Sequence, residues 1–345
     1  MQTDRRTIAT SISFLVFGIV AFLTTSVGAQ SIDLTAGNTG ISFGDSEEIT
    51  GIRFNFKDVR LRRLTGLNVT IWSPSEDIRS TVTGVAIGLP LAGARNFTGL
   101  GVGVLGFGAQ ENTTGIIAGL LGAGAGQDMF GIGIGGLGAG AGRDVQGIMI
   151  GGLGAGSGRN AKGIMIGGLG AGSGNDAVGV MIAGLGAGSG NDAVGVMFGG
   201  LGAGAGRDAT GMMFSILAAG AGRNLTGISA AGIAVGAGEK LEGVHVAGIA
   251  VGAPEITGFA GALIVGGERI KGLVIAPAYF RVGKNGQVNG LTISAFNHVK
   301  GEHRGVSIGI LNWAEKLNGL QIGLLNFAGN KDKLKWLPFF NYHRD

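Results

Sequence analysis

The chain has 345 residues, with 74 glycines, 5 prolines, no cysteine, 14 % charged residues and a net charge of +4. The glycines lack a three-residue period, which excludes collagen, and a hydrophobic fraction of 45 % excludes a disordered chain. The charge is too small, and the basic residues are too scattered, to indicate nucleic-acid binding. Because aromatic residues make up only 6 %, we expect a core of small and β-branched side chains.

Residues 1–29 have the pattern of a cleaved secretory signal peptide. Arg5 and Arg6 precede an apolar stretch at residues 12–23, and Val27-Gly28-Ala29 supplies the small residues that a signal peptidase requires. The apolar stretch is shorter than the ~20 residues that a membrane-spanning helix needs. We therefore expect export, cleavage after Ala29, and an N-terminal lead-in or cap at residues 30–50.

A repeat of about 16 residues fills most of the remaining chain. Glycine recurs every 16 residues at positions 99, 115, 131, 147, 163, 179, 195, 211, 227 and 243, and the period loosens slightly on either side. A typical unit is GIMIGGLGAGSGRNAK, which begins at Gly147. We predict one repeat array at residues 51–329 and a C-terminal cap at residues 330–345, because self-similarity at a fixed period is typical of solenoids.

The apolar residues of a unit lie at positions 2, 4, 7, 9, 11 and 15, counting the recurring glycine as position 1. This pattern alternates as in a strand, but its parity changes twice, and a straight strand cannot accommodate those changes. Corners near positions 5 and 6 and at the junction of positions 16 and 1 resolve the conflict. The sequence therefore predicts an all-β fold, a parallel β-solenoid of about 16-residue coils, with positions 2, 4 and 7 inside.

An antiparallel transmembrane β-barrel is the alternative fold. Strands of about ten to twelve residues suit a bilayer, and segments such as RNAK and NDAV would form the turns. The parity change would break each strand in the middle, and the face toward the lumen would carry almost no polar residues. These features favour the solenoid.

Three C-terminal segments share the form G-h-x-I-x-x-h-N, where h is hydrophobic: residues 290–297 (GLTISAFN), 305–312 (GVSIGILN) and 319–326 (GLQIGLLN). In this respect the chain resembles the glycine-rich surface-repeat proteins of bacteria with outer membranes, which are exported and have no assigned activity. The resemblance implies a surface or outer-membrane-associated role and supplies no catalytic residues. The middle of the chain departs from the motif, because glycine replaces the asparagine from about Gly138 to Gly202.

Position 3 is predicted to face outward, and its chemistry changes along the chain. It is polar in the flanking coils, whereas in the middle it is methionine next to glycine or other small residues. Methionine is an adaptable residue at binding surfaces. We therefore predict a flat glycine and methionine contact face formed by Met149, Met165, Met181, Met197 and Met213.

The turn at positions 12–14 offers weaker candidates for a metal site. Asp144, Asp176, Asp192 and Asp208 resemble locally the calcium-binding turns of nonapeptide-repeat toxins, but one aspartate per 16 residues falls short of that ligand set. Asparagine, aspartate and glycine are also what a tight turn requires. We expect no metal and no cofactor.

Catalytic motifs are sparse. The four histidines fall in separate coils or loops, none with HExxH spacing, and Gly305-Val306-Ser307-Ile308-Gly309 matches a nucleophile motif without the helix that should follow it. The sequence predicts a non-enzymatic structural or interaction protein, located at the cell surface, at the outer membrane or in the periplasm. Its expected partners are another copy of itself, an envelope assembly or a membrane surface, with no small-molecule substrate. A polysaccharide-acting enzyme is a weaker alternative.

Overall fold

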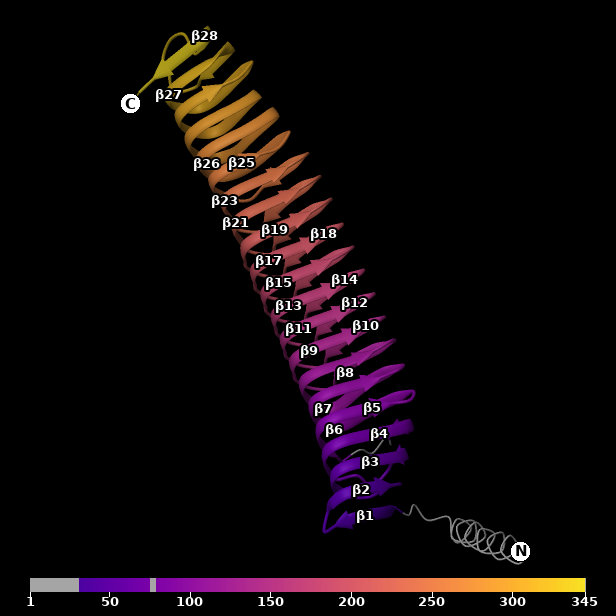
Figure 1. Cartoon of the computed structure of the whole chain (residues 1–345). Helices are drawn as coiled ribbons and strands as arrows, with labels where there is room; N and C mark the ends of the chain where they lie inside the picture. The colour runs from indigo at the N-terminus through magenta and orange to yellow at the C-terminus, as the bar shows by residue number, and fades with distance from the viewer. Residues whose placement is uncertain (1–30, 75–78, 345) are drawn as a thin grey trace, which may run out of the picture.

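The computed structural model describes residues 31–74 and 79–344. It shows an all-β parallel solenoid of about 17 turns with roughly 16 residues per turn, which confirms the predicted fold class. The chain winds as one gently curved rod with β1 at one end and β28 at the other (Figure 1). About 17 turns at ~4.8 Å each give a rod of roughly 80 Å. The predicted signal peptide at residues 1–29 lies outside the described residues.

Each central coil contains one long strand, from position 15 to position 5 of the next unit, and one short strand at positions 8–11. The long strands are β9 (Met129–Gly135), β11 (Val145–Gly151), β13 (Ala161–Gly167), β15 (Ala177–Ala183), β17 (Ala193–Gly199), β19 (Ala209–Ser215), β21 (Asn224–Ala231), β23 (Lys240–Ala247) and β25 (Glu255–Gly261). The short strands are β8 (Gly122–Ala125), β10 (Gly138–Ala141), β12 (Gly154–Ser157), β14 (Gly170–Ser173), β16 (Gly186–Ser189), β18 (Gly202–Ala205), β20 (Ala218–Ala221), β22 (Ala234–Ala237) and β24 (Ala250–Gly252).

Long strands pair in parallel with the long strands of neighbouring coils, and short strands pair with short strands. The register places each residue beside its equivalent one unit away, so that Met165 lies beside Met149 and Met181. The alternative arrangement of antiparallel strands between repeats is therefore wrong.

Strands toward the two ends of the rod vary more in length, from 5 residues in β1 to 45 in β26. They are β1 (Ile32–Ala36), β2 (Thr39–Phe43), β3 (Glu48–Asp58), β4 (Arg63–Pro74), β5 (Thr81–Gly88), β6 (Leu91–Gly103) and β7 (Gly106–Gly119), then β26 (Ile264–Ile308), β27 (Leu311–Ala328) and β28 (Trp336–His343). β1 pairs antiparallel with β2, and β28 pairs antiparallel with β27. The parallel stack thus ends in an antiparallel strand at both extremities, which gives the last parallel strand at each end a pairing partner.

The recurring glycine at position 1 bends the long strand. Its φ is positive in every coil from Gly51 through Gly319, and in Gly163 it is +124°. A Cβ atom on Gly163 would lie 2.1 Å from the carbonyl oxygen of Gly147 in the preceding coil. Stacked glycines are therefore required at this position, which explains why the period is marked by glycine.

The interior is narrow and lined by positions 3, 5, 9, 11 and 15. In the coil that begins at Gly147, the side chains of Met149, Ala155, Ser157 and Ala161 are buried, whereas Leu153 is exposed. The prediction that positions 2, 4 and 7 line the core is wrong. The junction of positions 16 and 1 bends but remains one strand, so alternation continues from position 15 through position 5 and turns positions 3 and 5 inward.

Candidate contact surface

The methionines predicted to form a contact face are buried in the solenoid. Their exposed fractions are 0 to 4 % for Met149, Met165, Met181, Met197 and Met213. A small space of about 30 Å³ lies along this column, where glycines at position 1 and alanines at position 15 supply little volume. Unbranched methionine side chains fill such irregular interiors well. The predicted glycine and methionine contact face is therefore wrong.

Polar residues at position 3 of the flanking coils are also buried, although we expected them on a hydrated face. Arg53 is fully buried and pairs with Asp58 and with Asp45, at 2.9 Å between Arg53 Nη2 and Asp45 Oδ1. Ser229 and His245 share the same column near the other end, with 2.8 Å between Oγ and Nδ1. Position 3 is thus one internal column whose chemistry changes from charged to thioether to polar along the rod.

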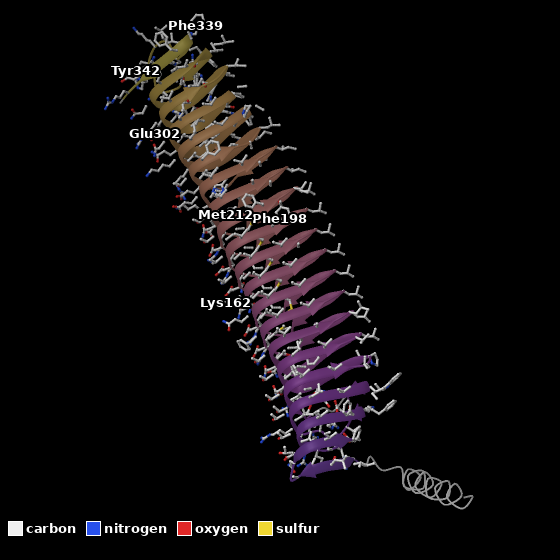
Figure 2. The ribbon with its side chains drawn as sticks, in the orientation of Figure 1. Lys162, Phe198, Met212, Glu302, Phe339 and Tyr342 are labelled. Atoms are coloured by element: carbon white, nitrogen blue, oxygen red, sulfur yellow. The ribbon has the colours of Figure 1, made fainter. Side chains whose placement is uncertain are left out.

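The edge at position 7 carries a continuous row of half-exposed leucine and isoleucine side chains. We call this row the leucine ridge, and its exposed fractions lie between 40 and 51 %. Its members are Leu121, Leu137, Leu153, Leu169, Leu185, Leu201, Leu217, Ile233, Ile249 and Leu263. Figure 2 shows carbon-only side chains along this edge of the rod. The ridge is the main surface feature that the sequence interpretation missed.

Positions 2 and 4 of the long strands add two outward-facing apolar rows. Ile164, Ile182 and Val196 are exposed, as are Phe198 and Met212, both labelled in Figure 2. Because like residues stack on like along the rod, these side chains form a second apolar face beside the ridge. The outward face of the long strands is therefore apolar at positions 2 and 4, whereas position 16 adds exposed polar side chains such as Lys162.

The face formed by the short strands is almost free of side chains. In β10, β12, β14, β16 and β18 the buried alanine or serine at positions 9 and 11 alternates with glycine at positions 8 and 10. We call this surface the glycine floor: Gly138, Gly140, Gly154, Gly156, Gly170, Gly172, Gly186, Gly188, Gly202 and Gly204. It continues at β18 to β24 as a shallow, open groove of about 540 Å³.

The edge opposite the ridge is polar, and its charges are paired between coils. Arg159 Nη2 lies 3.1 Å from Asp144 Oδ2, and Arg207 Nη2 lies 3.2 Å from Asp192 Oδ2. Figure 2 shows nitrogen and oxygen atoms along this edge, around Lys162 and Glu302. The rod is therefore amphipathic in cross-section, with one polar edge and three apolar or bare surfaces.

The aspartates proposed as weak calcium candidates lie on this polar edge and accept hydrogen bonds from the following coil. Asp144 Oδ1 accepts hydrogen bonds from the backbone N–H of Asn160 at 3.1 Å and from its side-chain amide at 2.9 Å. Asp176 and Asp192 accept a backbone N–H of the following coil in the same way, and Asp208 also pairs with arginine. No cluster of three potential metal ligands occurs within residues 31–74 and 79–344. The turns act as an inter-coil hydrogen-bond ladder.

A buried serine and histidine lie close together near the C-terminal end. Ser307, in the Gly-x-Ser-x-Gly string, has its Oγ 3.0 Å from Nε2 of His303, and Thr292 Oγ1 lies 3.4 Å from the same nitrogen. Burial lowers the pKa of His303 to about 4, so the imidazole is neutral at physiological pH. Neither side chain is more than 2 % exposed, so no substrate from solution reaches the pair.

The asparagines of the G-h-x-I-x-x-h-N motif form a buried ladder. Asn297 Nδ2 donates to Asn312 Oδ1, and Asn312 Nδ2 donates to Asn326 Oδ1, both at 2.7 Å. Nearby, the rings of Trp313 and Phe327 stack with centroids 4.0 Å apart. These repeated contacts make the motif a structural element of the C-terminal coils.

Comparison with models of known protein families, with curated proteins and with solved structures yields no match. Within the described part of the chain, no helix has the length and hydropathy needed to cross a membrane.

Proposed function

We propose that this protein is a non-enzymatic, exported structural or interaction protein of a bacterial envelope or cell surface. It presents the leucine ridge and the neighbouring apolar rows to an extended partner. The observation that carries the proposal is the half-exposed leucine or isoleucine at the same place in ten successive coils. A rigid rod with identical groups at a fixed spacing suits a partner that is itself repetitive or extended.

The size of the apolar surface supports a contact role. With ~100 Å² for a fully exposed leucine side chain, the ridge alone offers on the order of 450 Å². The rows at positions 2 and 4 roughly double this area, which then exceeds the ~300–600 Å² of the largest apolar patch on a typical monomer. Larger patches mark interaction sites, and here the patch follows the whole central rod.

The interior chemistry gives catalysis little support. The serine and histidine pair at Ser307 is closed to solvent, and Nδ1 of His303 has no side-chain hydrogen-bond partner among the described residues. A nucleophile and base need both access and a group that orients the base. The acidic side chains of the central turns lie singly on the polar edge, unlike the clustered carboxylates that cleave polysaccharides.

Export and contact can be tested together in a bacterium with an outer membrane. We expect the mature protein to begin at Gln30 and to sediment with the envelope. Changing Leu169, Leu185 and Leu201 together to serine should move most of it to the soluble fraction, because the ridge loses its apolar contact.

The matched control changes Asn175 and Asn191 on the polar edge to serine and should leave the distribution unchanged. Thermal unfolding of all variants should show that the rod is folded. Retention of the full-length precursor in the cytoplasm, or identical envelope binding of the leucine variant, would contradict the proposal.

A further inference from the structure

All but one of the ten floor glycines have room for a Cβ, unlike the glycines at the corners of the coil; the exception is Gly140, whose Cβ would lie 3.2 Å from the carbonyl oxygen of Gly156. A Cβ on Gly170 would meet nothing closer than the carbonyl oxygen of Gly186 at 4.0 Å, and a Cβ on Gly186 would meet nothing within 4 Å. By contrast, a Cβ on Gly168 at the corner would lie 1.8 Å from the oxygen of Gly152. Glycine at unstrained strand positions weakens a strand, and it often marks a place where another backbone approaches closely. The cause of the bare floor therefore lies outside the single chain.

The leucine ridge borders this floor directly. Leu169 and Leu185 immediately precede the floor strands β14 and β16, and about half of each side chain is exposed. A flat body laid on the floor would also cover the flank of the ridge. The two features together define one continuous surface along β8 to β24.

We propose that two copies of this chain associate face to face, floor against floor, with their rods antiparallel. This inference rests on the proposed contact function and names the partner. Packed sheets with side chains between them lie ~10 Å apart, whereas two bare glycine surfaces allow a closer approach of the backbones. A second copy has the same coil spacing, so contacts repeat in every coil.

The direction of the rods follows from the two edges that flank the floor. A two-fold axis across the rods makes them antiparallel and places the ridge of one copy beside the ridge of the other. A two-fold axis along the rods makes them parallel and places each ridge beside the partner's arginine and aspartate edge. Only the antiparallel arrangement joins apolar surface to apolar surface and leaves both polar edges in water.

The available area is sufficient for a stable dimer. The nine short strands β8 to β24 provide a flat face of roughly 570 Å², at ~3.3 Å per residue and ~4.8 Å per strand. The ridge exposes on the order of 450 Å², and covering the flank that borders the floor buries about half of it. The sum of about 800 Å² per copy matches the ~800 Å² per partner of a standard interface.

The charges favour a protein partner over a lipid surface at this face. Peripheral membrane elements combine apolar side chains with an excess of lysine and arginine. Here the floor has no side chains, and the arginines that flank it pair with aspartates of the preceding coil, as Arg159 does with Asp144 and Arg223 does with Asp208.

The test measures the mass of the purified mature protein in solution by light scattering after gel filtration. We expect twice the mass of one chain. Changing Gly170 and Gly186 together to lysine should give a single-chain mass with an unchanged unfolding transition, because both positions have free space outward. The control changes Asn175 and Asn191 to lysine, adds the same charge on the polar edge, and should remain dimeric.

Single cysteines test the direction, because the natural chain has no cysteine. Gly140, Gly156, Gly172, Gly188 and Gly204 are each changed to cysteine and oxidised. Two antiparallel rods should form a disulfide with high yield only near the two-fold axis, whereas parallel rods in register would form it at every position.

A single-chain mass of the natural protein would overturn the inference, as would a dimer that persists in the glycine-to-lysine variant. If a single-chain protein binds vesicles of neutral phosphatidylcholine through the ridge, the surface serves a membrane, and the proposed contact function survives without the dimer. Crosslinking at every position would overturn the antiparallel arrangement.

Discussion

Truncating one buried methionine and one ridge leucine in the same coil measures which of them belongs to the core. Met181 is 4 % exposed, and its neighbours in the column are Met165 and Met197. Met181→Ala should lower the free energy of unfolding by about 2–5 kcal/mol, because it removes buried atoms and leaves a cavity. Leu185 is 46 % exposed, so Leu185→Ala should cost no more than ~1 kcal/mol.

Urea unfolding followed by circular dichroism provides the comparison, since both variants keep the same strands and the midpoints can be compared directly. The measurement is made at low and high protein concentration, because loss of a ridge contact in a dimer would appear only at high concentration. If Leu185→Ala is as destabilising as Met181→Ala at low concentration, the leucines form the core and the assignment of the two faces is refuted.

Three further outcomes follow from individual residues. Gly163→Ala should destabilise the rod severely, because its φ is +124° and the new Cβ would lie 2.1 Å from a carbonyl oxygen, whereas Gly170→Ala should shift the thermal midpoint only slightly; equal shifts would contradict the distinction between required and free glycines. Below pH 6.5 the unfolded chain protonates His303, whereas the folded chain does so only near pH 4. The free energy of unfolding should therefore fall by about 3 kcal/mol as the pH drops through this window. His303→Gln should flatten that part of the profile of stability against pH, and an unchanged slope would argue against a buried neutral imidazole. Asn312→Ala breaks two buried side-chain hydrogen bonds and should cost about 1–3 kcal/mol by urea titration, while a cost near zero would show that the asparagine ladder is dispensable.

The period, the parallel stacking and the turn at positions 12–14 were predictable from the sequence because glycine marks the coil. The glycine at position 1 recurs since each one lies against the carbonyl oxygen of the last, as Gly163 does against Gly147. Stacking of equivalent residues then follows from the constant period. A constant spacing therefore specifies which residues pair between neighbouring coils, whichever face of the strand points inward.

The orientation of the side chains was not predictable from hydrophobicity, because both faces of the long strand are apolar. Ile148, Met149 and Ile150 are consecutive apolar residues, so alternation alone does not say which of them points inward. The flanking coils show which face points inward. Leu64 and Val82, two residues before the recurring glycine and so equivalent to position 15, are apolar and buried. In an unbroken strand, position 3 lies on the same side as these residues. Placing a corner between positions 16 and 1 reversed that side, and the predicted contact face with it.

The buried polar column was missed for a related reason. Arg53 and Asn68 at position 3 appeared suited to a hydrated face, but each finds its partners inside the first coils, where Asn68 Nδ2 donates to Asp58 Oδ2 at 3.1 Å. Whether a buried polar side chain has hydrogen-bond partners depends on contacts between neighbouring coils, and the repeat period alone does not predict those contacts.

Oxidation by dilute hydrogen peroxide tests most directly whether the methionines at position 3 are buried in the core, which leaves the leucine ridge on the surface. Met212 and Met213 are adjacent, but Met212 is 46 % exposed and Met213 only 2 %. Mass spectrometry of the folded protein should find sulfoxide first at Met212, while Met149, Met165, Met181, Met197 and Met213 remain protected until the rod unfolds. Rapid oxidation of those five methionines in the folded protein, with Met212 protected, would show that the faces are reversed and that the ridge cannot be the contact surface.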